Sequence, residues 1–226
     1  MQQIRLLVLG FKEEVSNSQL VKFRGAIINT IGQEEALLHN HTKDQFIYKY
    51  PHVQYKIINH KPVILALEDG IDAINYLFEK EVKNIQIGRT LYHLELEFCR
   101  PFFHTFQVWD HTFHYFIRDW WALNTENYNL FHDLKEEKLK IEFLEKKLVG
   151  NIISFAKSID WQIDKPIIVK IHDYEKHWRN YKKNNILAFN LNFETNIHIP
   201  QFLGLGKSSS IGFGTIFNLK NNINGK

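Results

Sequence analysis

The sequence contains a single cysteine, Cys99, among its 226 residues. One cysteine excludes a framework of disulfide bonds and is typical of a reducing compartment, so we expect a cytoplasmic protein. The sequence also lacks any apolar run as long as the roughly 18 residues of a membrane-spanning helix. Its first residues enter a strand pattern at once, which argues against a signal peptide. We therefore expect no membrane partner.

A large excess of charge of one sign is lacking too, because 28 lysines and arginines are set against 25 aspartates and glutamates. Aromatic side chains are abundant, with 18 phenylalanines, nine tyrosines and five tryptophans. Mild basicity with many aromatic rings suits RNA binding, in which bases stack on rings and phosphates meet lysine or arginine. An ordinary aromatic core gives the same counts, so composition alone does not decide between them.

Glycine is scarce, yet four of the eleven glycines lie within residues 202–217. Gly204, Gly206, Gly212 and Gly214 form two Gly-x-Gly pairs on either side of Lys207 and three serines. Such a loop can present backbone N–H groups and a lysine to phosphate, or it can be a glycine-rich hairpin without a ligand. A nucleotide-binding P-loop is excluded, because position 201 would have to be glycine and a helix would have to follow.

The first half of the chain predicts a split βαββαβ unit. Residues 3–11 are typical of a buried strand, and Leu20, Phe23, Ile27 and Ile31 recur at helical spacing. Two short strands, a third strand and a second helix follow, and then two further strand patterns complete the series. This is the ferredoxin-like order with one extra strand, and the sheet of that fold has one open face. The expected strands are 46–50, 53–58, 63–67, 84–88 and 91–98, and the second helix begins at Asp69-Gly70.

The second half, which we expect to begin after a boundary at Pro101, is also of α+β type. Residues 130–159 give the clearest helical pattern in the chain. Residues 176–183, basic and aromatic, are expected between two strands, where they could grip phosphates or form a solvated hairpin. The fold class is therefore α+β, with two tandem ferredoxin-like domains, 1–100 and 101–226, the second a diverged copy of the first. The other strands are expected at 102–109, 112–121, 167–171 and 186–193, with one more after the glycine loop.

Taken together, the C-terminal glycine motif and three other segments resemble a known family. The segments are Phe23-Arg-Gly-Ala, Leu38-His39-Asn40-His41 and Tyr50-Pro51-His52-Val53-Gln54-Tyr55-Lys56. The chain resembles, over its whole length, the CRISPR-associated endoribonucleases of the RAMP superfamily that cut repeat RNA into guide units. This resemblance implies two ferredoxin-like domains and metal-independent cleavage. In that reaction the ribose 2′-hydroxyl attacks the adjacent phosphate and leaves a 2′,3′-cyclic phosphate and a 5′-hydroxyl.

The catalytic histidine of the family follows the first helix, and that place corresponds to His39 or His41 in this sequence. Histidine titrates near neutral pH and can act as base or acid, and a nearby lysine can stabilise the charged transition state. We predict His41, His39, Tyr48 and Lys49 as the catalytic set, and the choice between the two histidines stays open.

A metal site is the alternative for this His-x-His pair, but zinc would need further ligands. Asp44, His52 and His60 are available without a recognised spacing, so we expect no metal and no cofactor. His111 and His114 are interpreted as surface or interface side chains.

Repeat RNA, as precursor and as mature guide, is the partner that the resemblance implies. Other CRISPR effector subunits and a second copy of the chain are further candidates. The main alternative is a non-catalytic RAMP subunit that only holds guide RNA, but such a subunit would have no need of a proton carrier after the first helix. A general RNA-binding domain outside CRISPR is disfavoured by the joint match across both halves. The predicted RNA-binding residues are Gly204, Gly206, Lys207, Ser208, Ser209, Gly212, Gly214, Lys56, Arg179 and Lys182.

Overall fold

The computed structural model describes residues 1–32, 41–42, 45–46 and 50–219. Their contacts divide the chain into two units. The first unit comprises residues 3–104 with 210–212, and the second comprises residues 1–2, 105–209 and the chain from residue 213 onward. The boundary expected at Pro101 falls inside one continuous strand, β8 (Leu96–Phe106).

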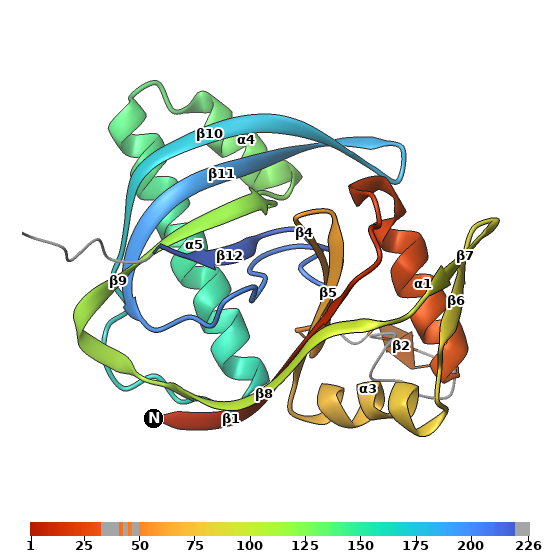
Figure 1. Ribbon diagram of the computed structural model, residues 1–226. Helices are drawn as coiled ribbons and strands as arrows, with labels where there is room; N and C mark the ends of the chain where they lie inside the picture. The colour runs from red at the N-terminus through yellow and green to blue at the C-terminus, as the bar shows by residue number, and fades with distance from the viewer. Residues whose placement is uncertain (33–40, 43–44, 47–49, 220–226) are drawn as a thin grey trace, which may run out of the picture. The chain divides into compact units, whose positions relative to one another are not determined.

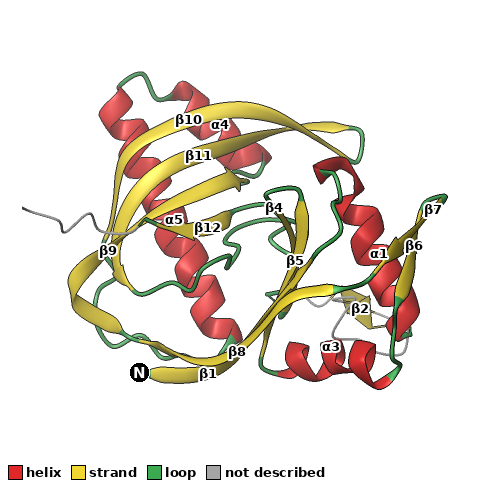
Figure 2. Ribbon diagram, viewed as in Figure 1, coloured by secondary structure: helices red, strands yellow, loops and turns green. Residues whose placement is uncertain are grey.

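The sheet of the first unit has the strand order β4-β5-β1-β8. Strand β5 pairs antiparallel with both β1 and β4. With α1 after β1 and α3 after β5, this is the βαββαβ arrangement of the ferredoxin-like fold, as the sequence predicts (Figures 1 and 2). The elements are β1 (Gln2–Phe11), η1 (Asn17–Gln19), α1 (Leu20–Ile31), β2 (His41–Thr42), β3 (Gln45–Phe46), β4 (Val53–Ile58), β5 (Lys61–Leu67), α3 (Asp69–Glu79), β6 (Asn84–Ile87), β7 (Thr90–His93) and β8.

The core of the first unit lies between its sheet and its two helices. Phe23 and Ile27 of α1 are buried together with Leu9 of β1 and Ile74 of α3. Each such side chain contributes about 1.5–3 kcal/mol to stability when it is buried. Because the apolar residues of α1 recur at helical spacing, they share one face, and this face packs against the sheet. The strand expected at 84–88 is found as β6, but the one expected at 91–98 is divided between β7 and the start of β8. Strands β6 and β7 form a separate hairpin that turns at Gly88, where φ is +65°, and β8 completes the main sheet.

The second unit repeats this strand order. Its sheet runs β10-β11-β9-β12 with antiparallel pairing throughout, and α4 and α5 follow β9 as α1 follows β1. A second helix is replaced by the glycine-rich segment that precedes β12, and the shared order fits the inferred duplication. The elements are β9 (Val108–Trp120), α4 (Thr125–Asp133), α5 (Glu137–Ser158), β10 (Val169–Tyr181), β11 (Asn184–Ile197) and β12 (Thr215–Asn218).

The helix expected at 130–159 is in fact two helices. Helix α4 begins earlier because the side chain of Asn124 accepts a hydrogen bond from the backbone N–H of Asn127 at 2.8 Å. It ends at Leu134, which has extended backbone angles, and α5 begins with Glu137 in its first turn, where the helix dipole favours a carboxylate. No helix among the described residues is long and apolar enough to span a membrane.

Candidate nucleic-acid interface

The glycine motif is folded onto its own backbone. Gly204 bridges to Thr215, and the N–H of Leu205 donates to the carbonyl of Gly214 at 2.9 Å. Gly214 has a φ of +62°, and a Cβ there would lie 1.8 Å from the carbonyl oxygen of Leu205. Glycine at this position is therefore required by close packing within the protein. The motif leads into strand β12, as predicted, whereas a P-loop would be followed by a helix.

The other glycines of the motif also lie close to protein atoms. Gly206 has a φ of +87°, and a Cβ there would lie 2.8 Å from Nε1 of Trp120. Gly212 belongs to the first unit, where neighbouring Ser210 accepts a hydrogen bond from the N–H of Tyr55. The N–H groups of Lys207 and Gly214 donate to backbone carbonyls at 3.3 and 3.1 Å. These contacts support a packing role for the backbone, because the N–H groups of Leu205, Lys207 and Gly214 already donate to carbonyls of the protein.

Lys207 is the exposed side chain of this motif. Its ammonium lies 5.4 Å from the ring centroid of Trp121, within range of a cation–π interaction. Desolvation by the surrounding protein lowers the pKa of Lys207. Ser208 is half-buried with a φ of +55°, whereas Ser209 is buried. Of the motif's predicted RNA contacts, Lys207 therefore has the side chain best placed to meet a phosphate.

The basic stretch 176–183 forms the end of the long β10–β11 hairpin and does not connect two separate strands. Lys182 and Lys183 make the turn, both with positive φ, between Tyr181 and its partner Asn184. Two-residue hairpin turns of this kind favour glycine or asparagine, so the sequence carries no conventional turn signal here. The turn places two lysines at the tip of the hairpin, whose two long strands Figure 1 shows.

Arg179 lies on the same hairpin beside an acidic partner that the sequence did not reveal. Its Nε is 3.7 Å from Oδ1 of Asp119, and Nε2 of His177 is 2.7 Å from that oxygen. Asp119 has a φ of +53°, an uncommon conformation for a residue other than glycine. The half-buried Arg179 is thus held by a carboxylate, while Lys182 is exposed.

Lys56 is placed differently from the prediction. Its side chain is 0% exposed in strand β4, and a buried ammonium has no surface for a phosphate to reach. The structure therefore does not support the predicted contact between Lys56 and RNA. The apolar–polar alternation of β4 continues through this residue and predicts that Lys56 faces solvent. The structure instead buries residues 53–57 on both faces of the strand.

Of the four predicted catalytic residues, His41 alone has a described backbone. It pairs with Phe46 between the short strands β2 and β3. His39, Tyr48 and Lys49 lie outside the described residues. The catalytic assignment therefore stays a prediction.

One cluster in the described part of the chain has donor atoms suited to a divalent cation. Cross-strand neighbours His114 and Glu194 meet His172, which lies at a register shift in β10. The ligand atoms of the three residues lie within 4.8 Å of one another. Nζ of Lys170 is 4.0 Å from Oε1 of Glu194, so an ion pair already engages the carboxylate. The cluster links three strands and was not predicted.

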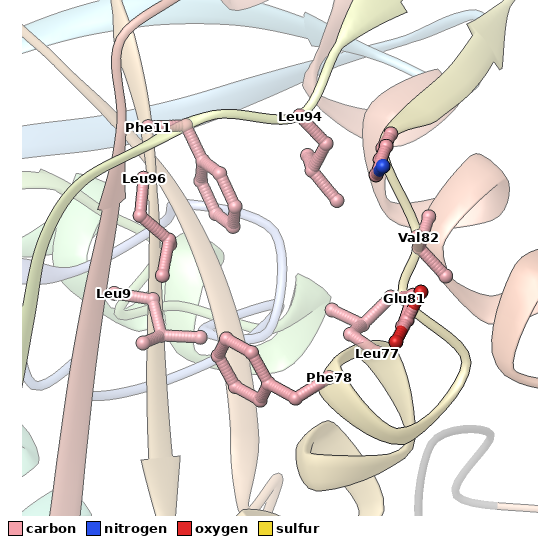
Figure 3. Close-up of a pocket in the computed structure, with 9 residues that line it drawn as sticks. Leu9, Phe11, Leu77, Phe78, Glu81, Val82, Leu94 and Leu96 are labelled. Carbon is pink, nitrogen blue, oxygen red and sulfur yellow. The ribbon is translucent and has the colours of Figure 1, made fainter.

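An apolar cavity of about 290 Å³ lies in the first unit (Figure 3). Phe11 and Leu96 from two strands face Phe78 and Leu77 of α3 across it. Its lining holds none of the predicted site residues. The cavity is therefore not the candidate interface.

Comparison with known proteins gives matches along nearly the whole chain. The family models for the Cas6b N-terminal and C-terminal domains match residues 2–100 and 107–219. A crystal structure of Cas6b is 29% identical, covering 96% of this chain and 100% of that one, with a TM-score of 0.87. A crystal structure of the CRISPR RNA processing endoribonuclease Cas6b is 25% identical, covering 97% and 100%, with a TM-score of 0.74.

A curated relative is the uncharacterized protein MJ0978 of Methanocaldococcus jannaschii. It is 32% identical over 140 residues, which are 62% of this chain and 95% of the relative. The two family models together account for both ferredoxin-like units. The chain therefore belongs to the Cas6b family.

Proposed function

We propose that this protein is an endoribonuclease that cuts CRISPR repeat RNA into guide units. The observation that carries the proposal is the joint match of both Cas6b domain models to residues 2–100 and 107–219. A solved structure that matches 97% of the chain at 25% identity is named as a CRISPR RNA processing endoribonuclease. The basic side chains of the second unit, Lys207, Arg179 and Lys182, supply the phosphate contacts that RNA binding needs.

The proposed reaction is a transesterification within the RNA. A base takes the proton of the 2′-hydroxyl, the 2′-oxygen forms a bond to phosphorus, and the bond from phosphorus to the 5′-oxygen breaks. An acid gives a proton to the departing 5′-oxygen, so the products are a 2′,3′-cyclic phosphate and a 5′-hydroxyl. His39 and His41 are the proton carriers, and Lys49 balances the charge that develops on phosphorus. Tyr48 is a further proton carrier or a stacking surface.

Because side chains supply the base, the acid and the cation, cleavage is expected to need no metal. Purified protein should cut its cognate repeat RNA in excess EDTA at the rate measured with magnesium. Product ends should carry the cyclic phosphate, which a phosphatase does not remove without prior acid opening. Loss of cleavage in EDTA that magnesium restores would contradict the metal-free reaction.

The His114–His172–Glu194 cluster provides the matched variant for this experiment. If EDTA slowed the wild-type protein but not Glu194→Gln, the metal would be acting through that cluster. If EDTA slowed the wild-type protein and Glu194→Gln equally, the metal would be acting at another place, such as the RNA itself.

Lys207 gives a separate test of the binding surface. Lys207→Ala should weaken the binding of repeat RNA and reduce the slope of log affinity against log salt by about 1, as expected for one lost phosphate contact. Filter binding or fluorescence anisotropy at several salt concentrations measures both quantities. Lys157→Ala on α5, also an exposed lysine of the second unit, is the control and should change neither. Unchanged affinity of Lys207→Ala at every salt concentration would remove this role.

The alternative function is a non-catalytic subunit that holds guide RNA. It predicts tight binding of repeat RNA with no cleavage under any condition. The cleavage assay in EDTA and in magnesium therefore separates the two functions, because binding without any cut product would favour the alternative.

A further inference from the structure

A second cavity, of about 370 Å³, lies in the second unit beside Lys207. Four separate segments build it: residues 121–128, which follow β9 and enter α4, Trp178 of β10, residues 185–187 of β11, and Lys207 of the glycine motif. Its volume falls in the range of small-ligand sites, about 300–1,000 Å³, and is sufficient for one nucleoside. The lining residues are Trp121, Leu123, Asn124, Thr125, Tyr128, Trp178, Asn185, Ile186, Leu187 and Lys207.

Three of the ten lining residues carry aromatic rings, and one of these rings is strongly exposed. Trp178 on β10 is 60% exposed, although tryptophan is usually well buried. Its ring centroid lies 6.4 Å from that of Tyr128, with an angle of 50° between the planes. More than half of the surface of Trp178 thus stays accessible to solvent, and the residue also lines a cavity. A stacking partner in the cavity would cover part of this surface.

The remaining wall is held rigid and carries positive charge. Nε1 of Trp121 donates a hydrogen bond to the carbonyl of Leu123 at 2.9 Å, and Lys207 places its ammonium over the same ring. Asn124 has its Oδ1 engaged at the start of α4, while Asn185 adds a second amide to the lining. A flat aromatic surface, a cation and amide groups together match the chemistry of a nucleotide: a π face, a phosphate and polar base edges.

We propose that this cavity binds one unpaired base of the RNA, stacked on Trp178, with an adjoining phosphate on Lys207. The inference rests on the proposed function for the presence of RNA and adds that the substrate has a single-stranded nucleotide at this position. Only an unpaired base can enter, because bases in an A-form duplex are stacked and their edges lie in grooves. A protein partner fits less well, since the same hairpin carries exposed Lys176, Lys182 and Lys183.

Trp178→Ala is the principal test. A stacked base is worth about 1–3 kcal/mol by alanine substitution, so the affinity for single-stranded repeat RNA should fall about 5- to 150-fold. Trp178→Phe keeps an aromatic face and should stay within about threefold of wild type. Phe103→Ala removes an aromatic side chain that is 68% exposed in the first unit, and it should not change the affinity. Thermal unfolding confirms that each variant is folded.

Abasic substitution along the RNA identifies the bound base. One abasic position should weaken wild-type binding by a factor similar to that of Trp178→Ala and have no effect on that variant, because the two changes remove the same contact. The proposal would be overturned if Trp178→Ala bound RNA with an affinity within twofold of wild type. It would also be overturned if no abasic position weakened wild-type binding in this way. Normal RNA binding together with lost self-association in sedimentation would identify a protein interface instead, and would overturn it too.

The Trp178→Ala variant and the wild-type protein test the cavity and the proposed function separately. If Trp178→Ala binds RNA normally while the wild-type protein still cuts repeat RNA, only the base-binding cavity is lost. If the wild-type protein neither binds nor cuts repeat RNA, the proposed function fails.

Discussion

Alanine in place of both His39 and His41 is expected to slow the cleavage of repeat RNA at least about a hundredfold. A general acid or base contributes on the order of 10²–10⁴ to the rate, and no other predicted residue in the segment titrates near neutral pH. The affinity for uncleaved RNA should change little, because the proton carriers act on the reacting atoms. Single-turnover rates and binding, measured on the same RNA, separate the two effects.

The single variants decide between the two histidines. The one that transfers the proton should show nearly the full loss when it is replaced alone, and the other should lose much less. His93→Ala is the control, because His93 is an exposed histidine on β7 outside the proposed catalytic set. A double variant that cuts at the wild-type rate would remove both histidines from the mechanism and direct the search to other proton carriers.

The fold was predictable because its signals are local. Leu20, Phe23, Ile27 and Ile31 recur at helical spacing, and the same face of α1 is buried in the structure. The alternation in 186–193 likewise becomes part of β11. Such patterns depend on which face of an element meets the core, which the neighbouring residues of the sequence already encode.

The candidate interface was predictable only in part, because its residues lie far apart in the sequence. The approach of Asp119 to His177 and Arg179 depends on the pairing of β9, β10 and β11. The cavity beside Trp178 forms only where four segments meet. No residue spacing in the sequence predicts that these segments come together. Burial is equally invisible, as the fully buried Lys56 illustrates. The sequence identified residue types suited to RNA, and the tertiary structure determines which of them reach the surface.

Gly214→Ala is expected to destabilise the second unit by about 2–5 kcal/mol. An alanine in the left-handed region costs about 1–2 kcal/mol, and φ at this position is +62°. Forcing extra atoms into a packed site costs about 1–3 kcal/mol more, and here the new Cβ would lie 1.8 Å from a backbone oxygen of Leu205. The melting temperature should fall by roughly 4–20 °C.

Gly150→Ala is the matched control, because Gly150 lies within α5 of the same unit and a Cβ there would meet no atom within 4 Å apart from its chain neighbours and the backbone of its own helix. It should be neutral or stabilising by up to about 1 kcal/mol, since alanine favours a helix interior.

An unchanged melting temperature for Gly214→Ala would contradict the packing role. The backbone at Leu205 and Gly214 would then have to open at little cost, and its N–H groups would become available to phosphate. A loss of RNA affinity without a loss of stability would therefore favour direct binding by the loop. A loss of both would mean that the glycines serve the RNA by holding Lys207 in place.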